Sequence, residues 1–317
     1  MAAVFPDDET MMTALRLACC APSVHNTQPW RWRVGPSSVH LHADPTRRLP
    51  ATDPDGRDLV ISCGAALHHL VTALAAFGWR SRVHRAPDPA DPTRLATVEL
   101  AYAAPVHADV LAASAITRRR SDRRAYADWP VGDAQLRELI RAAAESGVRA
   151  RVVTGPALSR LAELTKLADS PARRDELARW SGRRAGSPDG VPAANATREV
   201  RYGDLIMRRF SSPGLPSPPG GPGTLLLLGT ESDDVGSRLR AGEATSALSL
   251  AATALRLASC PITRSLETAE SRERVRVEVL GEELVPQVVF RVGRPAAGAG
   301  AVPRTPRRPL AEVLDPS

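Results

Sequence analysis

Two stretches of this 317-residue chain repeat one pattern of small and apolar residues. Residues 63–79, CGAALHHLVTALAAFGW, align with residues 241–257, AGEATSALSLAATALRL, and the alignment pairs Gly64 with Gly242 and Leu70 with Leu248. Both stretches are crowded with glycine and alanine, which let neighbouring backbones approach closely. An internal repeat of this kind predicts two similar helices, each built to pack tightly against another element.

The elements around these helices also recur in order. Residues 9–21 and 133–145 both have apolar residues at helical spacing, and each is followed by a β-rich run, at 30–34 and 149–155. Further strand patterns follow at 96–102 and 286–295. We therefore predict an α+β protein with two related halves, residues 1–113 and 114–317, in which mixed or antiparallel sheets pack against helices.

The halves differ in three places. Only the first has the polar loop PSVHNTQP, at residues 22–29, and only the second has the basic run ITRRRSDRRAY, at residues 116–126. The second also contains residues 170–223, rich in Pro, Gly, Ser and Arg, which are predicted to form a lid or insertion. Within them we expect a helix ending at Trp180 and a second helical stretch at 197–210, with Trp180 and Phe210 able to cover a flat ring.

Composition narrows the class of protein. The net charge of +7 comes almost wholly from arginine, since Lys166 is the sole lysine. Apolar runs such as Leu225 to Leu228 are far too short to span a bilayer, and the acidic N-terminus does not resemble a signal peptide. We expect a cytoplasmic protein that does not bind membranes, and no nucleic-acid partner is expected unless the basic run described next forms a binding patch. The four cysteines lack metal-ligand spacing, so no metal site is predicted.

The basic run leaves three interpretations open at this point. It could be a nucleic-acid patch, but only Tyr126 and Trp129 lie nearby for stacking. It could be a solvated charged surface, or an anion site in which arginines and a serine hold a phosphate group. The chain also lacks a nucleophile elbow and a phosphate-binding glycine loop. We therefore predict no catalytic side chain and expect a cofactor to carry any chemistry.

Several of these segments resemble one family. APSVHNTQPWRWRV, at residues 21–34, resembles the P-S-x-x-N-x-Q-P-W segment of FMN-dependent nitroreductases. RRRSDRRAY resembles the Arg-Arg-Ser signature of the same proteins, and residues 241–263 resemble their central helix and the turn after it. Over residues 9–312 the chain is most similar to the Acg-type branch, whose members carry two nitroreductase-like halves in one chain.

The resemblance implies one FMN held between the halves, as at a nitroreductase dimer interface. Each half would supply part of the site: a loop from the first half would contact the flavin across the interface, arginines and a serine would hold the phosphate and ribityl chain, and a turn would lie near flavin N5. The residues implied for this cofactor site are Pro22, Ser23, Val24, Asn26, Gln28, Arg119, Arg120, Ser121, Thr263, Arg264, Arg307 and Arg308.

The same resemblance implies an oxidoreductase. Hydride would pass from NAD(P)H through the flavin to a nitroaromatic, a quinone or a similar small-molecule acceptor. Because both halves lie in one chain, the protein could act as a monomer. The alternative is a flavin-sequestering or storage protein whose lid stays closed over FMN, with little or no turnover. Arg264, where many relatives have glycine, could crowd the space above the flavin.

Overall fold

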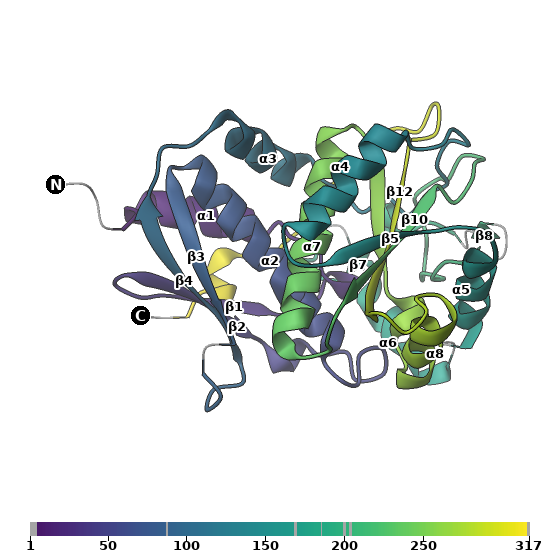
Figure 1. Ribbon diagram of the computed structural model, residues 1–317, viewed down its shortest axis with the longest axis horizontal. Helices are drawn as coiled ribbons and strands as arrows, with labels where there is room; N and C mark the ends of the chain where they lie inside the picture. Colours follow the sequence, from purple (N-terminus) through teal and green to yellow (C-terminus); the bar gives the residue numbers. More distant parts are fainter. Residues whose placement is uncertain are drawn as a thin grey trace.

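The computed structural model describes residues 5–86, 88–167, 170–184, 186–198, 201–202 and 205–315. Two four-stranded antiparallel sheets lie on either side of a central helix pair, as Figure 1 shows. This architecture confirms the predicted α+β class.

The first sheet contains β1 (Trp30–Val34), β2 (Ser38–Ala43), β3 (Trp79–Arg85) and β4 (Arg94–Tyr102), in the spatial order β1-β2-β4-β3. Helices α1 (Asp8–Ala18), α2 (Arg57–Ala76) and α3 (His107–Arg118) accompany it. Trp30 pairs with Ala43 and Trp32 with Leu41, so both tryptophans point to one face, where they are fully buried. The alternation of Trp and Arg in this strand therefore separates core from surface.

The second sheet contains β5 (Arg149–Val153), β10 (Thr224–Thr230), β11 (Ala258–Ile262) and β12 (Val285–Gly293). Its spatial order, β5-β10-β12-β11, is that of the first sheet when strands are matched in chain order. Helices α4 (Asp133–Ala144) and α7 (Val235–Ala254) take the chain positions of α1 and α2, while α5 (Gly155–Leu167) and α8 (Ala269–Glu278) have no counterpart in the first half. The shared order of elements agrees with the repeat seen in the sequence.

Helices α2 and α7 cross at the glycines that the repeat aligns. A Cβ on Gly64 would lie 2.0 Å from the carbonyl oxygen of Leu239, and a Cβ on Gly242 would lie 2.0 Å from that of Ile61. No side chain fits at either position, so the two helix backbones touch. Helix α2 is long and apolar enough to cross a membrane, but most of its apolar stretch is buried inside the protein, as in a core helix.

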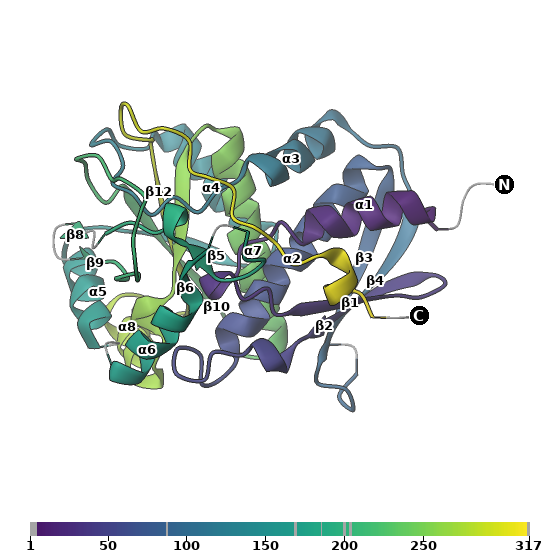
Figure 2. The same ribbon diagram turned by 180° about the vertical axis from the view of Figure 1, so that it is seen from behind.

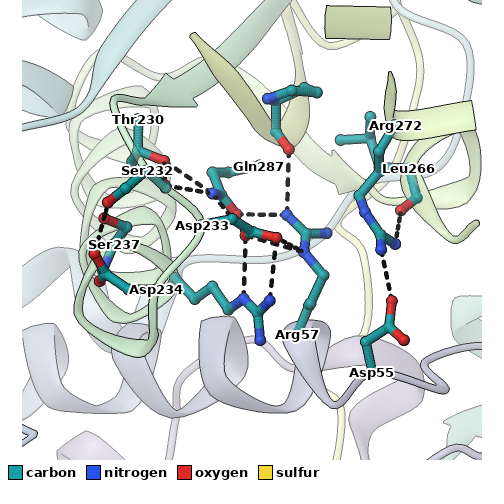
Figure 3. A network of polar contacts seen from close by, with 12 residues as sticks. Asp55, Arg57, Thr230, Ser232, Asp233, Asp234, Ser237, Leu266, Arg272 and Gln287 are labelled. Atoms are coloured by element: carbon teal, nitrogen blue, oxygen red, sulfur yellow. Dashed lines mark hydrogen bonds and ion pairs between the residues drawn. The ribbon is translucent and has the colours of Figure 1, made fainter. Parts of the chain in front are cut away.

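A buried polar network ties the first turn of α2 to the second sheet (Figure 3). Arg57, at 1% exposure, donates from Nη2 to Gln287 Oε1 at 2.6 Å and to the Pro286 carbonyl oxygen at 3.2 Å. Its Nε contacts Asp233 at 3.2 Å, and Gln287 in turn donates to Thr230 Oγ1 at 2.8 Å. A buried guanidinium needs such partners, and here all of them come from the other half.

Residues 170–223, hereafter the strap, run across the junction of the halves. They contain α6 (Pro171–Trp180), β6 (Ser181–Arg183), β7 (Val191–Pro192), β8 (Arg201–Tyr202) and β9 (Leu205–Ile206). The helix ending at Trp180 is confirmed. The second helix, predicted at 197–210, is wrong where the chain is described, because β8 and β9 pair as an antiparallel hairpin. The glycine between these strands disfavours helix; residues 199–200 and 203–204 of that prediction lie outside the described residues.

The C-terminal arm, residues 294–315, returns to the first sheet. Figure 2 shows it in yellow, leaving β12 and crossing to the short helix α9 (Leu310–Val313) beside β1. The Asp315 backbone N–H donates to the Trp32 carbonyl oxygen at 2.7 Å. The last described residues of the second predicted half thus pack on the first.

The close approach of the two helices at Gly64 predicts whether an added methyl group raises or lowers the free energy of unfolding. Because a methyl group at position 64 would meet backbone, Gly64→Ala should lower the free energy of unfolding by about 3 kcal/mol, the upper end for overpacking. Gly300→Ala, where a Cβ meets nothing within 4 Å, is the control and should change it by less than about 0.5 kcal/mol. Chemical denaturation measures both. A gain of about 1 kcal/mol for Gly64→Ala, the ordinary effect in an open helix, would contradict the close approach.

Candidate functional site

A cavity with two chambers lies between the halves and beneath the strap. The apolar chamber has an empty volume of about 890 Å³ and the basic chamber about 570 Å³, both counting space at their mouths. Pro22, Ser23, Ser121 and Arg123 line both, so the chambers adjoin. The first two residues come from the first half and the last two from the second.

The polar loop of residues 22–28 enters the cavity in a strained conformation. His25, Asn26 and Gln28 have φ values of 51°, 57° and 51°, which are uncommon for residues other than glycine. Ser23 Oγ accepts from the Gln28 backbone N–H at 3.0 Å, and the Val24 N–H donates to a serine of α2, Ser62, at 3.3 Å. Strain that the surroundings maintain in this way is typical of ligand-binding segments.

Two side chains of this loop bind the protein itself. Asn26 Nδ2 donates to the carbonyl oxygens of Gly190 and Pro306, at 3.0 and 3.2 Å. Gln28 Nε2 donates to the Pro188 carbonyl at 2.8 Å, and its Oε1 accepts from the Arg308 backbone N–H at 2.8 Å. Asn26 still lines the basic chamber, whereas Gln28 lines neither. Both amides hold the strap and the C-terminal arm against the first half.

Arginines without carboxylate partners surround the basic chamber. In the part of the chain that the structure describes, no carboxylate lies within 4 Å of Arg119, Arg120, Arg304 or Arg307, and Nε of both Arg119 and Arg120 has no hydrogen-bond partner. Burial, and to a smaller extent neighbouring arginines, lower the pKa of Arg119 to about 9. Burial is also the largest effect on the pKa of Arg307 and lowers it to about 10. Buried cations of this kind need an anion.

Arg307 is held at the C-terminal end of α1. Its Nε donates to the Cys19 carbonyl at 3.0 Å, and its Nη2 donates to the Cys20 and Ala21 carbonyls at 3.1 and 3.0 Å. Carbonyls at a helix C-terminus carry partial negative charge and favour a cation there. This anchoring fixes the guanidinium at the chamber wall.

The outcome for the arginines of the C-terminal run is mixed. Arg308, expected in the same site as Arg307, lines neither chamber; its side chain lies near Asp44 at 3.7 Å and Glu312 at 3.3 Å. Arg304, which sequence analysis did not single out, lines the basic chamber. Both belong to one arginine run, so only the path of the C-terminal arm could decide which of its members face the cavity.

The apolar chamber has walls from both halves. Ile61 and Ala65 of α2 line it together with Ile262 of β11 and Val288 of β12, and the strap contributes further apolar side chains. Thr263, Arg264 and Val24, three of the residues implied for the cofactor site, also line it. Arg264 donates to the Met207 carbonyl of the strap at 3.3 Å. The chamber offers an apolar group room beside the adjoining basic chamber.

The strap covers the apolar chamber with only one of the two expected aromatic residues. Phe210 lines it, and the Arg123 guanidinium lies 5.0 Å from the centre of its ring. Trp180 is absent from the lining; the guanidinium groups of Arg47 and Arg183 lie 5.4 and 5.5 Å from the centre of its ring. The cation–π contact with Arg47, a residue of the first half, holds Trp180 against that half.

Ion pairs and hydrogen bonds hold the strap closed at both ends. Glu176, at 2% exposure, accepts from the backbone N–H groups of Ala51 and Thr52 at 3.1 and 2.7 Å. Arg208 pairs with the buried carboxylate of Glu267 and donates to Thr263 Oγ1 at 2.9 Å. Burial is the largest effect on the pKa of Glu267 and raises it.

Comparison with known proteins identifies the class. The chain is 48% identical over 322 residues, covering 98% of it and 92% of the relative, to the Mycobacterium tuberculosis protein named "Putative NAD(P)H nitroreductase Rv3131". It is 35% identical over 320 residues, covering 96% of the chain and 95% of the relative, to "Putative NAD(P)H nitroreductase acg" of the same species. No protein-family model matches the sequence.

The fold agrees. The crystal structure of a nitroreductase-type protein from Anabaena variabilis superposes with a TM-score of 0.52 at 12% identity, over 92% of this chain and 90% of that one. The fold is therefore the nitroreductase fold. The chain belongs to the nitroreductase family, in the Acg-type branch, as its motifs predict.

The basic chamber predicts an unusual effect of phosphate. In phosphate-free buffer, Arg119→Met removes a buried, unpaired charge and should not lower the melting temperature. Inorganic phosphate at ten times its Kd should stabilise the wild-type protein by about 1.4 kcal/mol and the variant by much less. Arg118→Met, at an exposed neighbour, is the control. Thermal denaturation with and without phosphate measures the stabilisation of each protein. Equal stabilisation of the wild type and both variants would exclude Arg119 from an anion site.

Proposed function

We propose that this protein is an FMN-dependent oxidoreductase that takes hydride from NAD(P)H and passes it to a nitroaromatic, quinone or similar small-molecule acceptor. The observation that carries the proposal is a cluster of arginines, without a carboxylate partner among the described residues, that adjoins an apolar chamber. FMN has the matching form, a dianionic phosphate linked through a ribityl chain to a planar tricyclic ring. The names of the M. tuberculosis relatives support NAD(P)H as the electron donor.

The residues present fit this cofactor. Arg119, Arg120 and Arg307 would hold the phosphate, each supplying charge that no carboxylate in the described part of the chain neutralises. Ser23 and Ser121, where the chambers join, would hold the ribityl chain. Thr263 and Arg264 would lie along the edge of the ring. FMN supplies a two-electron carrier, so the protein needs no nucleophilic side chain.

The chain's own groups act by positioning and exclusion. The strap covers the apolar chamber through Met207 and Phe210, which limits access of water. Anchoring of Arg307 on helix-end carbonyls fixes the phosphate pocket before any ligand arrives, so little ordering is needed on binding.

The differences between the two halves explain why we expect one FMN site in each chain. Residues 1–113 and 114–317 would correspond to the two subunits of a dimeric nitroreductase, with residues 170–223 as an insertion in the second. Only the second half carries the basic run and only the first the polar loop, so one site is complete. The protein would act as a monomer in the cytoplasm, with one FMN.

The composite site can be tested from either side. Arg120→Ala, in the second half, should weaken FMN binding by about tenfold or more, because a hydrogen bond to a charged group contributes about 1.5–3 kcal/mol. Ser23→Ala, in the first half, should weaken it by a smaller factor, since its hydroxyl bond is to a neutral group. Fluorescence titration of flavin into the stripped protein measures both, with Arg118→Met as the control. Unchanged affinity in the Ser23 variant would contradict a site shared between the halves.

The closed strap favours a second candidate function, flavin storage. A strap held by Glu176 and by the Arg208–Glu267 pair could exclude the nicotinamide from the ring. The FMN-loaded protein is the test: it should oxidise NAD(P)H when a quinone or nitroaromatic is added. We expect turnover, because lids in many enzymes open on the timescale of catalysis.

Loosening the strap separates the two functions. Glu176→Gln removes the charge from two hydrogen bonds to backbone, and FMN should dissociate several-fold faster. Glu163→Gln, on the exposed face of α5, is the control. Stopped-flow flavin release and steady-state NAD(P)H oxidation are measured together. If turnover is absent in the wild type and appears only in Glu176→Gln, the protein is a store; turnover of similar rate in both supports the enzyme.

A further inference from the structure

His25 has a polar atom that the protein leaves unsatisfied. The side chain lines the apolar chamber at 4% exposure, and its Nε2 has no hydrogen-bond partner within the described part of the chain. The backbone is also left-handed there, with φ of 51°. A buried polar atom without a partner is unfavourable, and so is a left-handed backbone at a residue other than glycine. Two unfavourable features therefore meet at one cavity-lining residue.

The charges around His25 indicate what would bind it. The charged residues lining this chamber, among those described, are Arg123, Arg208 and Arg264, and no carboxylate lines it. Arg208 comes from the strap, and both of its contacts, with Thr263 and Glu267, involve Nη2. Burial, together with Arg208 and Arg123, lowers the pKa of His25 well below its usual value, so the ring is neutral and Nε2 can carry a proton to donate.

The surrounding wall is apolar and suits a ring. Ile61, Met207 and Phe210 line the same chamber as His25. A planar ring packed here would place a substituent near one neutral donor and one guanidinium, which together satisfy the two oxygens of a carboxylate. The phosphate of a flavin would not compete, since its arginines line the other chamber.

We propose that His25 and Arg208 form the acceptor subsite and that the preferred acceptors are aromatic compounds bearing a carboxylate. This inference rests on the proposed function, because the acceptor would bind beside FMN. His25 then determines specificity and takes no part in electron transfer. The substituent is recognised and leaves unchanged, while the nitro or quinone group elsewhere on the ring is reduced.

Equilibrium binding to the oxidised, FMN-loaded protein tests this directly. Benzoate and benzamide have the same shape and differ in charge, and neither can be reduced by the flavin. The flavin absorbance change on titration gives each Kd. Wild type should bind benzoate about tenfold more tightly or better, as expected for a charge-assisted hydrogen bond. Equal affinities in wild type would overturn the proposed acceptor class without any variant.

Variants assign the preference to His25. His25→Leu should reduce the benzoate preference to about twofold, and His25→Gln, whose amide can donate near the position of Nε2, should retain most of it. His107→Leu, on the exposed first turn of α3, is the matched control and should behave as wild type. The ratio of kcat/KM for 4-nitrobenzoate against 4-nitrobenzamide should change in parallel.

The possible failures can be told apart. A full benzoate preference in His25→Leu would show that another group recognises the carboxylate. Loss of FMN from His25→Leu, with FMN retained in His107→Leu, would show that His25 binds the cofactor instead of the acceptor. A wild-type protein that takes up no FMN would contradict the proposed function itself and this inference with it.

Discussion

The backbone contact between α2 and α7 is the constraint on which the rest depends. At Gly64 and Gly242 each helix leaves no room for a Cβ on the other, so the two long helices are in backbone contact at one point. The sheets, which follow the same strand order, extend from this contact in opposite directions. Arg57 reinforces it by placing a buried charge of the first half among acceptors of the second. The cavity exists because the halves are held at this separation.

Charge is distributed unevenly along that junction. The guanidinium of Arg57 contacts the carboxylate of Asp233 and the amide oxygen of Gln287, so it serves to hold the two halves together. Around Arg119 the matching carboxylate is missing in the described part of the chain, which leaves a buried cation facing a cavity. The protein thus uses the same side chain in two ways, and the difference lies in which partners the fold provides. A bound phosphate would remove the desolvation cost that the folded chain bears at Arg119.

Much of the fold was predictable because it follows from residue patterns within short stretches of the sequence. Small residues at helical spacing predicted α2 and α7, and the order of helices and strands predicted two related α+β halves. Contacts between distant segments were not predictable. The polar loop was expected to bind flavin through Asn26 and Gln28, but their amides bind residues far along the chain, Gly190, Pro188 and Arg308. The same limit explains the helix wrongly predicted at 197–210, where tertiary pairing forms a hairpin.

The family motif predicted some of the residues that line the cavity, and only the structure revealed others. The family resemblance placed Ser23, Arg119 and Ser121, all of which line the cavity, while their roles toward FMN remain predictions. It gave no sign of His25 or Arg304, since nothing in a local pattern distinguishes a histidine that faces a cavity from one that faces the core. Burial without a partner is visible only in three dimensions.

The central claim is that two halves of one chain build one flavin site. Native mass spectrometry of the FMN-loaded protein tests it most directly, because it counts chains and cofactors in the same particle. We expect one chain with one FMN. Two FMN per chain would contradict a single site, and FMN found only on a dimer of chains would show that the two halves of one chain do not suffice.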